Sequence, residues 1–373
     1  MGARIYLDWN ATAPVRPAVV EAVRLALGET GNASSVHGEG RAARNRLDQA
    51  RRQVAAMVHC LPSEVVFMSG GTEANNAILS LASWRNVLVS AIEHDSVRLV
   101  RPDAIVVPVT SQGIVDLAWL ANALAKVEGP TLVSVMLANN ETGVIQPIGE
   151  IASLVHAARA CLHSDAVQAA GRMAIDCRAI GCDYLSLSSH KIGGPQGVGA
   201  LIVRGTAPFA VRQVGGGQER GRRGGTENVA GVVGFGVAAG LATEGLAMMT
   251  TVARLRDRFE AGCLSKLPAA HVWGAAANRL PNTSCIAMPG VAAETQVMAL
   301  DLAGIAVSAG AACSSGRVRS SHVLAAMGAA PPNESIRVSL GEATTEAEID
   351  RLIAVWCGLA NRRRGNVTQA VAA

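Results

Sequence analysis

The sequence predicts an α/β fold, with a mostly parallel seven-stranded sheet in a large domain and a smaller α+β domain toward the C-terminus. Short, continuously apolar runs alternate with helical patterns through the first two-thirds of the 373 residues. This alternation is typical of parallel strands that are covered by helices on both faces. A chain of this length also exceeds what one hydrophobic core comfortably holds, so two domains are expected.

Seven apolar runs are predicted to form the strands of the large domain. Each run is short and bounded by turn residues, as expected for a buried strand. The predicted strands are Val65–Ser69, Val87–Ser90, Ala104–Val109, Thr131–Leu137, Cys161–Ser164, Tyr184–Ser188 and Val198–Val203. Helices are expected near Leu117–Lys126 and Ile148–Ala160, and another begins within Gly70–Asn76.

The pattern changes after an apolar run at Val229–Ala242 and an Arg/Glu-rich helical pattern at Val252–Leu267. We expect the apolar run to be a buried helix, because glycines interrupt it and it is shorter than a membrane span. Two strands and two helices are then predicted, at Thr283–Met288, Ser335–Leu340, Thr295–Leu302 and Thr344–Asn361. The large domain is therefore predicted over residues 15–255, and the small domain over residues 1–14 and 256–373.

The amino-acid composition limits the kinds of partner that the protein is expected to bind. Aromatic residues make up 3% of the chain and the net charge is only +4, so a nucleic-acid partner is not expected. The chain opens without a charged-then-apolar leader, which predicts a cytoplasmic protein without a membrane partner. The eight cysteines form no CxxC pair, so no metal site is predicted and most of them are expected to be small buried groups.

Lysine is scarce, and one of the three copies stands in a suggestive place. Lys191 follows the predicted strand Tyr184–Ser188 and precedes a glycine-rich turn. A primary amine there can form a Schiff base with a carbonyl group and later act as a base, which an arginine cannot do at ordinary pH. The other two, Lys126 and Lys266, stand near predicted helix ends, where a cation is ordinary.

Polar groups follow several of the predicted strands, at the sheet edge where ligands of such folds bind. Asp165 could pair with a protonated pyridine nitrogen or simply cap a helix. His94 could lie flat against a ring, and Asn140 could supply an amide, although a loop histidine and a polar turn are the plain alternatives. The turn Ser69–Thr72 opens a helix and could bind a phosphate or only connect two elements.

Three further features each allow a functional interpretation and a purely structural one. Cys313 lies among small residues in Ser308–Arg317, as an accessible nucleophile would, or it is a small buried thiol. Arg337 interrupts a strand pattern and suits a substrate carboxylate, or it is a surface cation. The run Gly215–Thr226 could bind an anion through backbone amides, or it is a flexible loop.

The order of these motifs along the chain resembles that of NifS/IscS-type cysteine desulfurases, which are pyridoxal-phosphate-dependent members of the class V aminotransferase superfamily. The similarity extends over almost the whole chain and implies fold type I of the pyridoxal-phosphate-dependent transferases. The motifs that carry it are Tyr6-Leu7-Asp8, Asn10-Ala11-Thr12, Gly31–Ser35 with His37, Ser69–Glu73, Glu93-His94, Asn139–Gly143, Asp165 with Gln168, Ser188–Pro195, Gly224–Thr226, Cys313 and Arg337.

The resemblance implies a role for each matched residue. Lys191 would bind pyridoxal 5'-phosphate as a Schiff base, Asp165 would pair with its pyridine nitrogen, and Gln168 would reach its ring hydroxyl. His94 would stack on the ring and serve catalysis. The phosphate would be held by Gly71, Thr72, Ser188, His190 and Thr226, the last from the second subunit of a homodimer. Asn140 would contact cofactor and substrate, and the substrate carboxylate would be bound by Arg337 and Asn32.

Departures from the pattern are small, because no reacting group is lost. Ala33 stands where proline is usual, Ser189 where glycine is usual, and Gly71 where alanine is common. The segment around Cys313 resembles that of the longer-loop group of these desulfurases.

The resemblance implies that Cys313, as a thiolate, takes the sulfur of L-cysteine and keeps it as a persulfide, with L-alanine as the other product. A sulfur-acceptor protein, such as an iron–sulfur scaffold, would then receive the sulfur. Two alternatives remain open. A small-amino-acid transaminase or a selenocysteine lyase would use the same lysine apparatus, and a non-catalytic sulfur- or metal-carrying protein would use only the cysteines.

Overall fold

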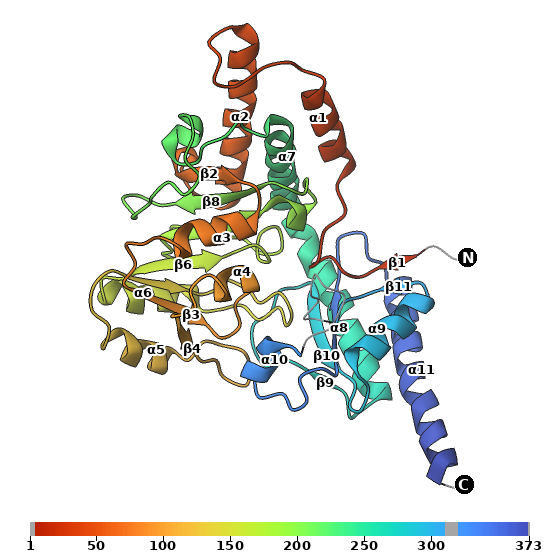
Figure 1. Cartoon of the computed structure of the whole chain (residues 1–373). Coiled ribbons are helices and arrows are strands. Elements are labelled where there is room, and N and C mark those ends of the chain that lie inside the picture. Colours follow the sequence, from red (N-terminus) through yellow and green to blue (C-terminus); the bar gives the residue numbers. More distant parts are fainter. Residues whose placement is uncertain (1–3, 310–319, 372–373) are drawn as a thin grey trace.

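A seven-stranded sheet forms the centre of the larger part of the molecule (Figure 1). The computed structural model describes residues 4–309 and 320–371, with side chains as far as residue 360. In spatial order the strands are β2 (Val65–Met68), β8 (Gly199–Val203), β7 (Tyr184–Ser188), β6 (Cys161–Asp165), β5 (Thr131–Ser134), β3 (Asn86–Ser90) and β4 (Ile105–Val107). β8 is antiparallel to both neighbours and the other pairs are parallel. The predicted mostly parallel sheet is therefore confirmed.

Both faces of this sheet are covered by helices, because successive side chains of a strand point to opposite sides. Val65 and Phe67 of β2 pack in one core with α2 (Gly38–Met57), α5 (Leu117–Leu124), α6 (Ile148–Ala157) and α7 (Val229–Gly245). Val66 and Met68 pack in a second core with α3 (Gly71–Leu79). α1 (Pro17–Leu27) lies against α7, and α4 (Asp95–Arg98) lies against α3.

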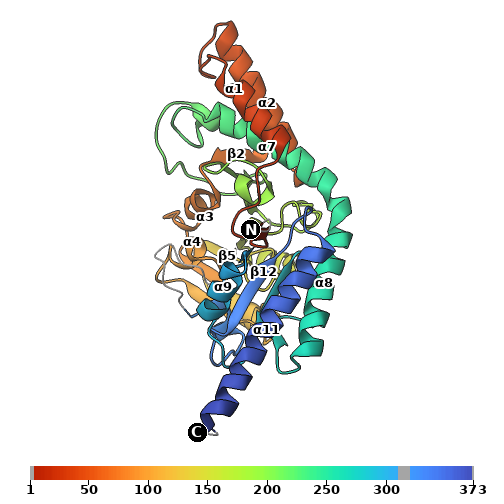
Figure 2. The same ribbon diagram turned by 90° about the vertical axis from the view of Figure 1, so that its right-hand side faces the viewer.

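The predicted buried helix over Val229–Ala242 is α7, which continues through a short 3-10 turn, Leu246–Met248, into α8 (Met249–Lys266). Together they form one long, bent helical path from α2 down to the level of α11 (Figure 2). By length and composition alone this helix could cross a membrane, but half of its most apolar window is buried inside the protein. A core helix of a soluble protein has the same properties, and α7 packs against both α1 and α2.

A separate set of elements forms the smaller part. Its antiparallel sheet has the order β12 (Ser335–Ser339), β10 (Thr283–Ala287) and β9 (His271–Val272). β1 (Ile5–Tyr6) pairs in parallel with β11 (Ile305–Ala306). The helices are α8, α9 (Ala293–Leu302), α10 (His322–Ala326) and α11 (Glu346–Val371).

This smaller part has its own hydrophobic core, centred on the fully buried rings of Phe259 and Trp356. Leu7, from the start of the chain, packs in this core, whereas Val19 packs in the core of the large sheet. Val252, near the predicted boundary at residue 255, also packs in the smaller core. The division into residues 15–255 and the remainder stays a prediction.

Candidate active site

Most of the predicted cofactor-binding residues line one cavity of about 260 Å³. It lies at the carboxyl ends of the central strands, where ligands bind in open α/β sheets. Strand β6 ends at Asp165 and strand β7 at Ser188. The lining residues are Gly71, Thr72, Asn75, His94, Ser96, Met136, Asn140, Asp165, Val167, Gln168, Ser188, His190 and Lys191.

Lys191 lies in a 3-10 turn, Ser189–Ile192, that directly follows β7 and ends at Gly193, which has a left-handed φ of 78°. Its Nζ donates hydrogen bonds to the backbone carbonyls of Asn10 and Ala11, at 2.5 and 2.9 Å. Both acceptors are uncharged, so they do not form an ion pair that would favour the protonated amine.

The pKa of Lys191 is lowered to about 7. Burial is the main cause, followed by the positive charges of Arg337 and Arg172, while Asp8 and Asp165 partly oppose the shift. A buried amine near other cations prefers to be neutral. A substantial fraction of Lys191 is therefore unprotonated and nucleophilic at neutral pH, as carbonyl chemistry requires.

Asp165 is buried in the wall of the same cavity. Its Oδ2 accepts a hydrogen bond from Asn75 Nδ2 of α3 at 2.7 Å, and its Oδ1 accepts one from the Val167 backbone N–H at 2.9 Å. An ionised carboxylate has about four acceptor sites, so these two bonds orient the group and leave capacity for a further donor in the cavity.

The N-terminus of α3 forms the end of the cavity that suits an anion. Gly70 supplies no side-chain cap to this nine-residue helix, so the first backbone N–H groups are open to a ligand. A Cβ on Gly71 would lie 2.8 Å from Val167 Cγ2, so a larger residue at position 71 would require the Val167 side chain to shift. Thr72 and Ser188 add hydroxyl groups to this end of the cavity.

His190 is also found in the cavity wall, with its Nδ1 3.2 Å from Thr12 Oγ1. Burial, together with the charges of Lys191 and Arg172, lowers the pKa of His190 to about 4. The imidazole is therefore neutral at neutral pH, and it can serve a ligand as a hydrogen-bond donor but not as a cation.

His94 caps the short helix α4 through its Nδ1, which accepts a hydrogen bond from the Ser96 backbone N–H at 3.1 Å. The preceding residue, Glu93, is fully buried, and burial raises its pKa to about 8. The Glu93 backbone carbonyl accepts a hydrogen bond from His322 Nε2 of α10 at 2.9 Å. The loop that carries His94 is thus held in place from the smaller part of the molecule.

Three predicted residues within the described part of the chain do not line this cavity. Arg337 is buried on β12, where it donates to the Asp8 carboxylate at 2.8 Å and to the Asn140 carbonyl at 3.0 Å. Asn32 and Thr226 are exposed in the single chain. Cys313 lies outside the described residues.

Sequence reasoning missed two residues that orient the site. Asn75 fixes Asp165, and it was passed over because it lies inside a helix pattern with other polar residues. Arg172 donates to Gln168; its position four residues after Gln168 was the only available signal. The carbonyls of Asn10 and Ala11, which hold Lys191, carry no side-chain signal at all.

Known proteins with similar sequences and structures identify the family of this chain. The aminotransferase class-V family model matches residues 5–352. The chain belongs to the aminotransferase class-V family. Within it, the cysteine desulfurase of Cereibacter sphaeroides is 45% identical in an alignment 369 positions long, and the match covers 94% of this chain and 94% of its own. The cysteine desulfurase of Enterobacter agglomerans is 41% identical over 93% of this chain and 90% of its own.

Solved structures that are similar to this chain support the same family assignment. A NifS-like protein from Rickettsia africae superposes with a TM-score of 0.88 at 36% identity, covering 95% of this chain and 98% of that one. A structure described as SspA in complex with cysteine has a TM-score of 0.75 at 27% identity, covering 91% of this chain and all of that one. The predicted resemblance, fold class and enzyme class are confirmed.

Proposed function

We propose that this protein is a pyridoxal-phosphate-dependent enzyme that converts L-cysteine to L-alanine and transfers the sulfur to Cys313 as a persulfide. One observation carries the proposal. A single cavity combines a half-buried amine whose pKa is about 7, a buried carboxylate and an uncapped helix N-terminus. These groups match the aldehyde, the pyridine nitrogen and the phosphate of the cofactor. The cysteine desulfurases at 40–45% identity support the same function.

The donor set fits the cofactor at each of its polar groups. Lys191 would bind the aldehyde and Asp165 would face the pyridine nitrogen, with Gln168 at the ring oxygen. The N–H groups at Gly71 and Thr72 would hold the phosphate together with Ser188 and His190. When bound, the cofactor supplies an electrophilic carbon and a ring that takes up the electron pair released at the substrate's α-carbon.

Lys191 is suited to move the α-proton of the substrate. Because its amine is substantially neutral near pH 7, Nζ can accept a proton without first losing one. Once protonated, it can donate to the carbonyls of Asn10 and Ala11, which already lie within hydrogen-bond distance. The same nitrogen can later return a proton to the substrate.

Arg337, Asn32 and Asn140 would bind the amino acid. Arg337 Nε is buried without a partner among the described residues, so it has a donor left for a substrate carboxylate. The complex of SspA with cysteine supports cysteine as the ligand class. His94, on the cavity wall, would stack on the cofactor ring and assist proton transfer.

Sulfur transfer would take place at Cys313. Its thiolate would attack the sulfur of the substrate, so that an S–S bond forms while the Cβ–S bond breaks. The electron pair of the broken bond remains with Cβ, which then gains a proton and becomes the methyl group of alanine. In sum, L-cysteine and the Cys313 thiol give L-alanine and the Cys313 persulfide, without an external oxidant.

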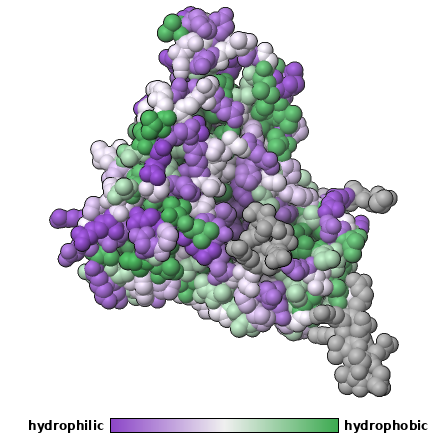
Figure 3. Space-filling model, in the orientation of Figure 1, coloured by the Kyte–Doolittle hydropathy of each residue, from purple (hydrophilic) through white to green (hydrophobic). Residues whose placement is uncertain are grey.

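The assembly we propose is a homodimer in which Thr226 reaches the phosphate site of the partner subunit. Exposed apolar side chains on α1 support a partner surface there: Val20, Leu25 and Leu27 are 54%, 53% and 72% exposed. Apolar side chains also gather over α1 in the space-filling view (Figure 3). The persulfide would pass to a sulfur-acceptor protein, such as an iron–sulfur scaffold, in the cytoplasm.

The test is an absorbance spectrum of the purified protein, followed by addition of L-cysteine under reducing conditions. We expect a band near 400 nm, about where lysine-bound pyridoxal phosphate absorbs, and sulfide and alanine in equal amounts. A Cys313→Ser variant should keep the band and lose sulfide release. A band without sulfide from the parent protein would favour a transaminase or a lyase, and the absence of any band would overturn the proposal.

A further inference from the structure

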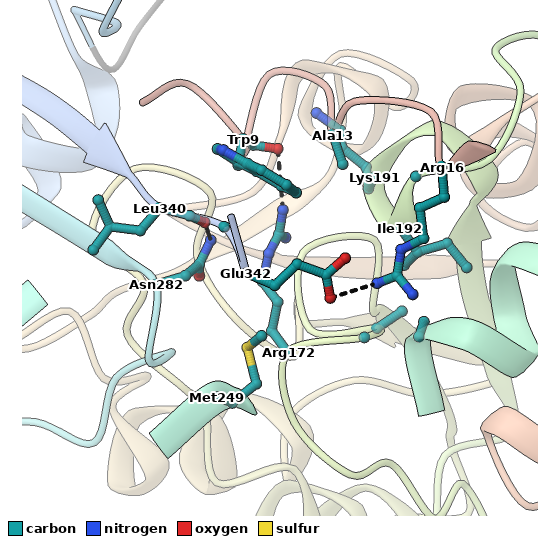
Figure 4. Close-up of a pocket in the computed structure, with 15 residues that line it drawn as sticks. Trp9, Ala13, Arg16, Arg172, Lys191, Ile192, Met249, Asn282, Leu340 and Glu342 are labelled. Atoms are coloured by element: carbon teal, nitrogen blue, oxygen red, sulfur yellow. Dashed lines mark hydrogen bonds and ion pairs between the residues drawn. The ribbon is translucent and has the colours of Figure 1, made fainter. Parts of the chain in front are cut away.

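The side chain of Arg172 joins Gln168 to the N-terminal segment through hydrogen bonds, of which the one to Trp9 is drawn in Figure 4. Its NH1 group donates to the backbone carbonyl and to Oε1 of Gln168, both at 2.6 Å. Its NH2 group donates to the Trp9 carbonyl at 3.2 Å. All three acceptors are uncharged oxygens, so none of them neutralises the guanidinium.

A buried guanidinium bonded only to neutral oxygens is costly. Arg172 is 7% exposed, and burial, with the nearby charge of Arg337, lowers its pKa to about 9. Removing a charged group from water without a counter-charge is among the more expensive events in folding. Hydrogen bonding to Gln168 and Trp9 alone would not require a full positive charge. The charge is therefore expected to act on a neighbouring group.

The bond to Gln168 fixes which end of its amide faces which neighbour. A guanidinium has only donors, so the atom of Gln168 that lies against it must be the oxygen. The Gln168 Nε2 is then left to donate to the Asn10 carbonyl, at 3.0 Å, and toward the cavity that Gln168 lines. Gln168 can therefore offer the cavity an N–H donor and selects a hydrogen-bond acceptor there.

Charges around Lys191 come from both parts of the molecule. Arg337 on β12 and Arg172 both disfavour its protonated form, and Asp8 and Asp165 oppose them. His190, one residue away, is neutral because burial lowers its pKa to about 4. Arg337 is already paired with Asp8, whereas Arg172 has no carboxylate partner among the described residues, so the charge of Arg172 is the less compensated of the two.

We propose that Arg172 is a positioning residue of the cofactor site. It holds Gln168 with an N–H group toward the cavity and keeps an uncompensated positive charge close to Lys191. The site thereby favours an unprotonated ring oxygen on the ligand and an unprotonated nitrogen on Lys191. This inference rests on the proposed function, because the ring oxygen belongs to the proposed cofactor.

A matched control is available in the same neighbourhood. Arg172 and Lys191 also line a second, small cavity of about 40 Å³. Arg16 lines it too and pairs with Glu342 at 3.2 Å (Figure 4). Arg16 is thus an arginine near Lys191 whose charge is compensated.

The experiment is a pH titration of the absorbance band of the holoenzyme, whose midpoint reports protonation of the Lys191 nitrogen that carries the cofactor. Arg172→Met should raise the midpoint by roughly one unit, the low end of what a neighbouring like charge contributes. Arg16→Met should leave it within a few tenths of a unit. Arg172→Lys keeps the positive charge. Its midpoint should therefore lie closer to that of the parent protein than to that of Arg172→Met.

Arg172→Gln provides a second neutral variant that can still donate one hydrogen bond, in case Arg172→Met does not fold. It should raise the midpoint in the same direction, with a far-UV circular dichroism spectrum like that of the parent. Midpoints equal to the parent's in folded neutral variants would overturn the role of Arg172 and leave the proposed function intact. A parent protein without the band would overturn the proposed function, and this inference with it.

Discussion

At the scale of single residues, the chemistry of the site depends on groups that are deprived of their usual partners. Lys191 is half-buried, and within the described part of the chain its amine donates only to the backbone carbonyls of Asn10 and Ala11. Its low pKa has a consequence for cofactor loading, because only the neutral amine attacks an aldehyde.

We therefore expect the rate of cofactor uptake by the cofactor-free protein to rise with pH and to level off above about pH 7. Below this pKa the amine is protonated, and each unit of pH lowers the reactive fraction about tenfold. The absorbance increase after mixing with pyridoxal phosphate, measured from pH 5.5 to 9.5, gives the rate. A rate that keeps rising toward the ordinary lysine pKa of 10.5 would contradict the assigned environment.

Asp165 is expected to be essential through its charge and not through its shape. Asp165→Asn keeps the volume and one acceptor, but it cannot stabilise a protonated pyridine nitrogen. We expect kcat to fall by roughly a hundredfold or more, the scale of losing one well-placed electrostatic group, with thermal stability little changed. Asp103→Asn is the control, since Asp103 is exposed and pairs with Arg101 at the surface. Equal activity of Asp165→Asn and the parent enzyme would rule out the pyridine pairing.

Residues that follow predicted strands could be assigned from the sequence, and their partners could not. Lys191 and Asp165 both stand at strand ends, and the parallel sheet brings such ends to one edge. Asn75 and Arg172 act through contacts that depend on how α3 and the turn after β6 pack. The position of Arg337, shared between Asp8 and the Asn140 carbonyl, also required the tertiary structure.

At the scale of elements, the glycines of α7 explain how an apolar helix lies so close to its neighbours. A Cβ on Gly236 would lie 2.6 Å from the Ala50 Cα of α2, and one on Gly234 would lie 2.6 Å from Val23 of α1. Glycine in a helix costs conformational entropy, and here the close packing of three helices offsets that cost.

Gly236→Ala should therefore destabilise the protein by about 1–3 kcal/mol, the usual cost of overpacking, because the clash is with backbone that cannot rotate away. Gly240→Ala, in the same helix with open space around its Cα, should instead stabilise by about 0.5–1 kcal/mol. Urea denaturation of both variants gives the comparison. A stabilised Gly236→Ala would show that the two helices can separate at little cost.

At this scale, the elements with a strong apolar pattern are the ones that the sequence predicts most accurately. Tyr184–Ser188 was predicted with its bounds correct, and the strand predicted over Thr131–Leu137 ends at Ser134. No helix was predicted over residues 17–57, where the structure has α1 and α2. Most of the buried face of α2 consists of small residues or Arg51, and only Leu47, Val54 and Met57 supply large apolar side chains, so the pattern from which an amphipathic helix is recognised is weak.

At the scale of the whole molecule, the exposed apolar side chains of α1 argue for a second subunit. We expect light scattering to give about twice the 38.3 kDa of one chain. Leu25→Glu, on α1, should weaken association by roughly 30-fold or more, the effect of losing about 2 kcal/mol at an interface anchor. Leu264→Glu, on α8, is a matched change elsewhere and should leave the mass unchanged. A parent protein of monomer mass would refute the dimer.

The N-terminal segment has a consequence for the order in which the site can form during synthesis. Ile5 pairs with Ile305, and the Trp9 N–H donates to the Ser339 carbonyl. These contacts of the first residues to be synthesised therefore form only after much of the C-terminal part has been made. The segment that carries the Asn10 and Ala11 carbonyls therefore gains its contacts to β11 and β12 only after the final third of the chain has emerged. A nascent chain released before that point could hold this segment through its bonds to Gln168, Arg172 and His190, but not through those to β11 and β12.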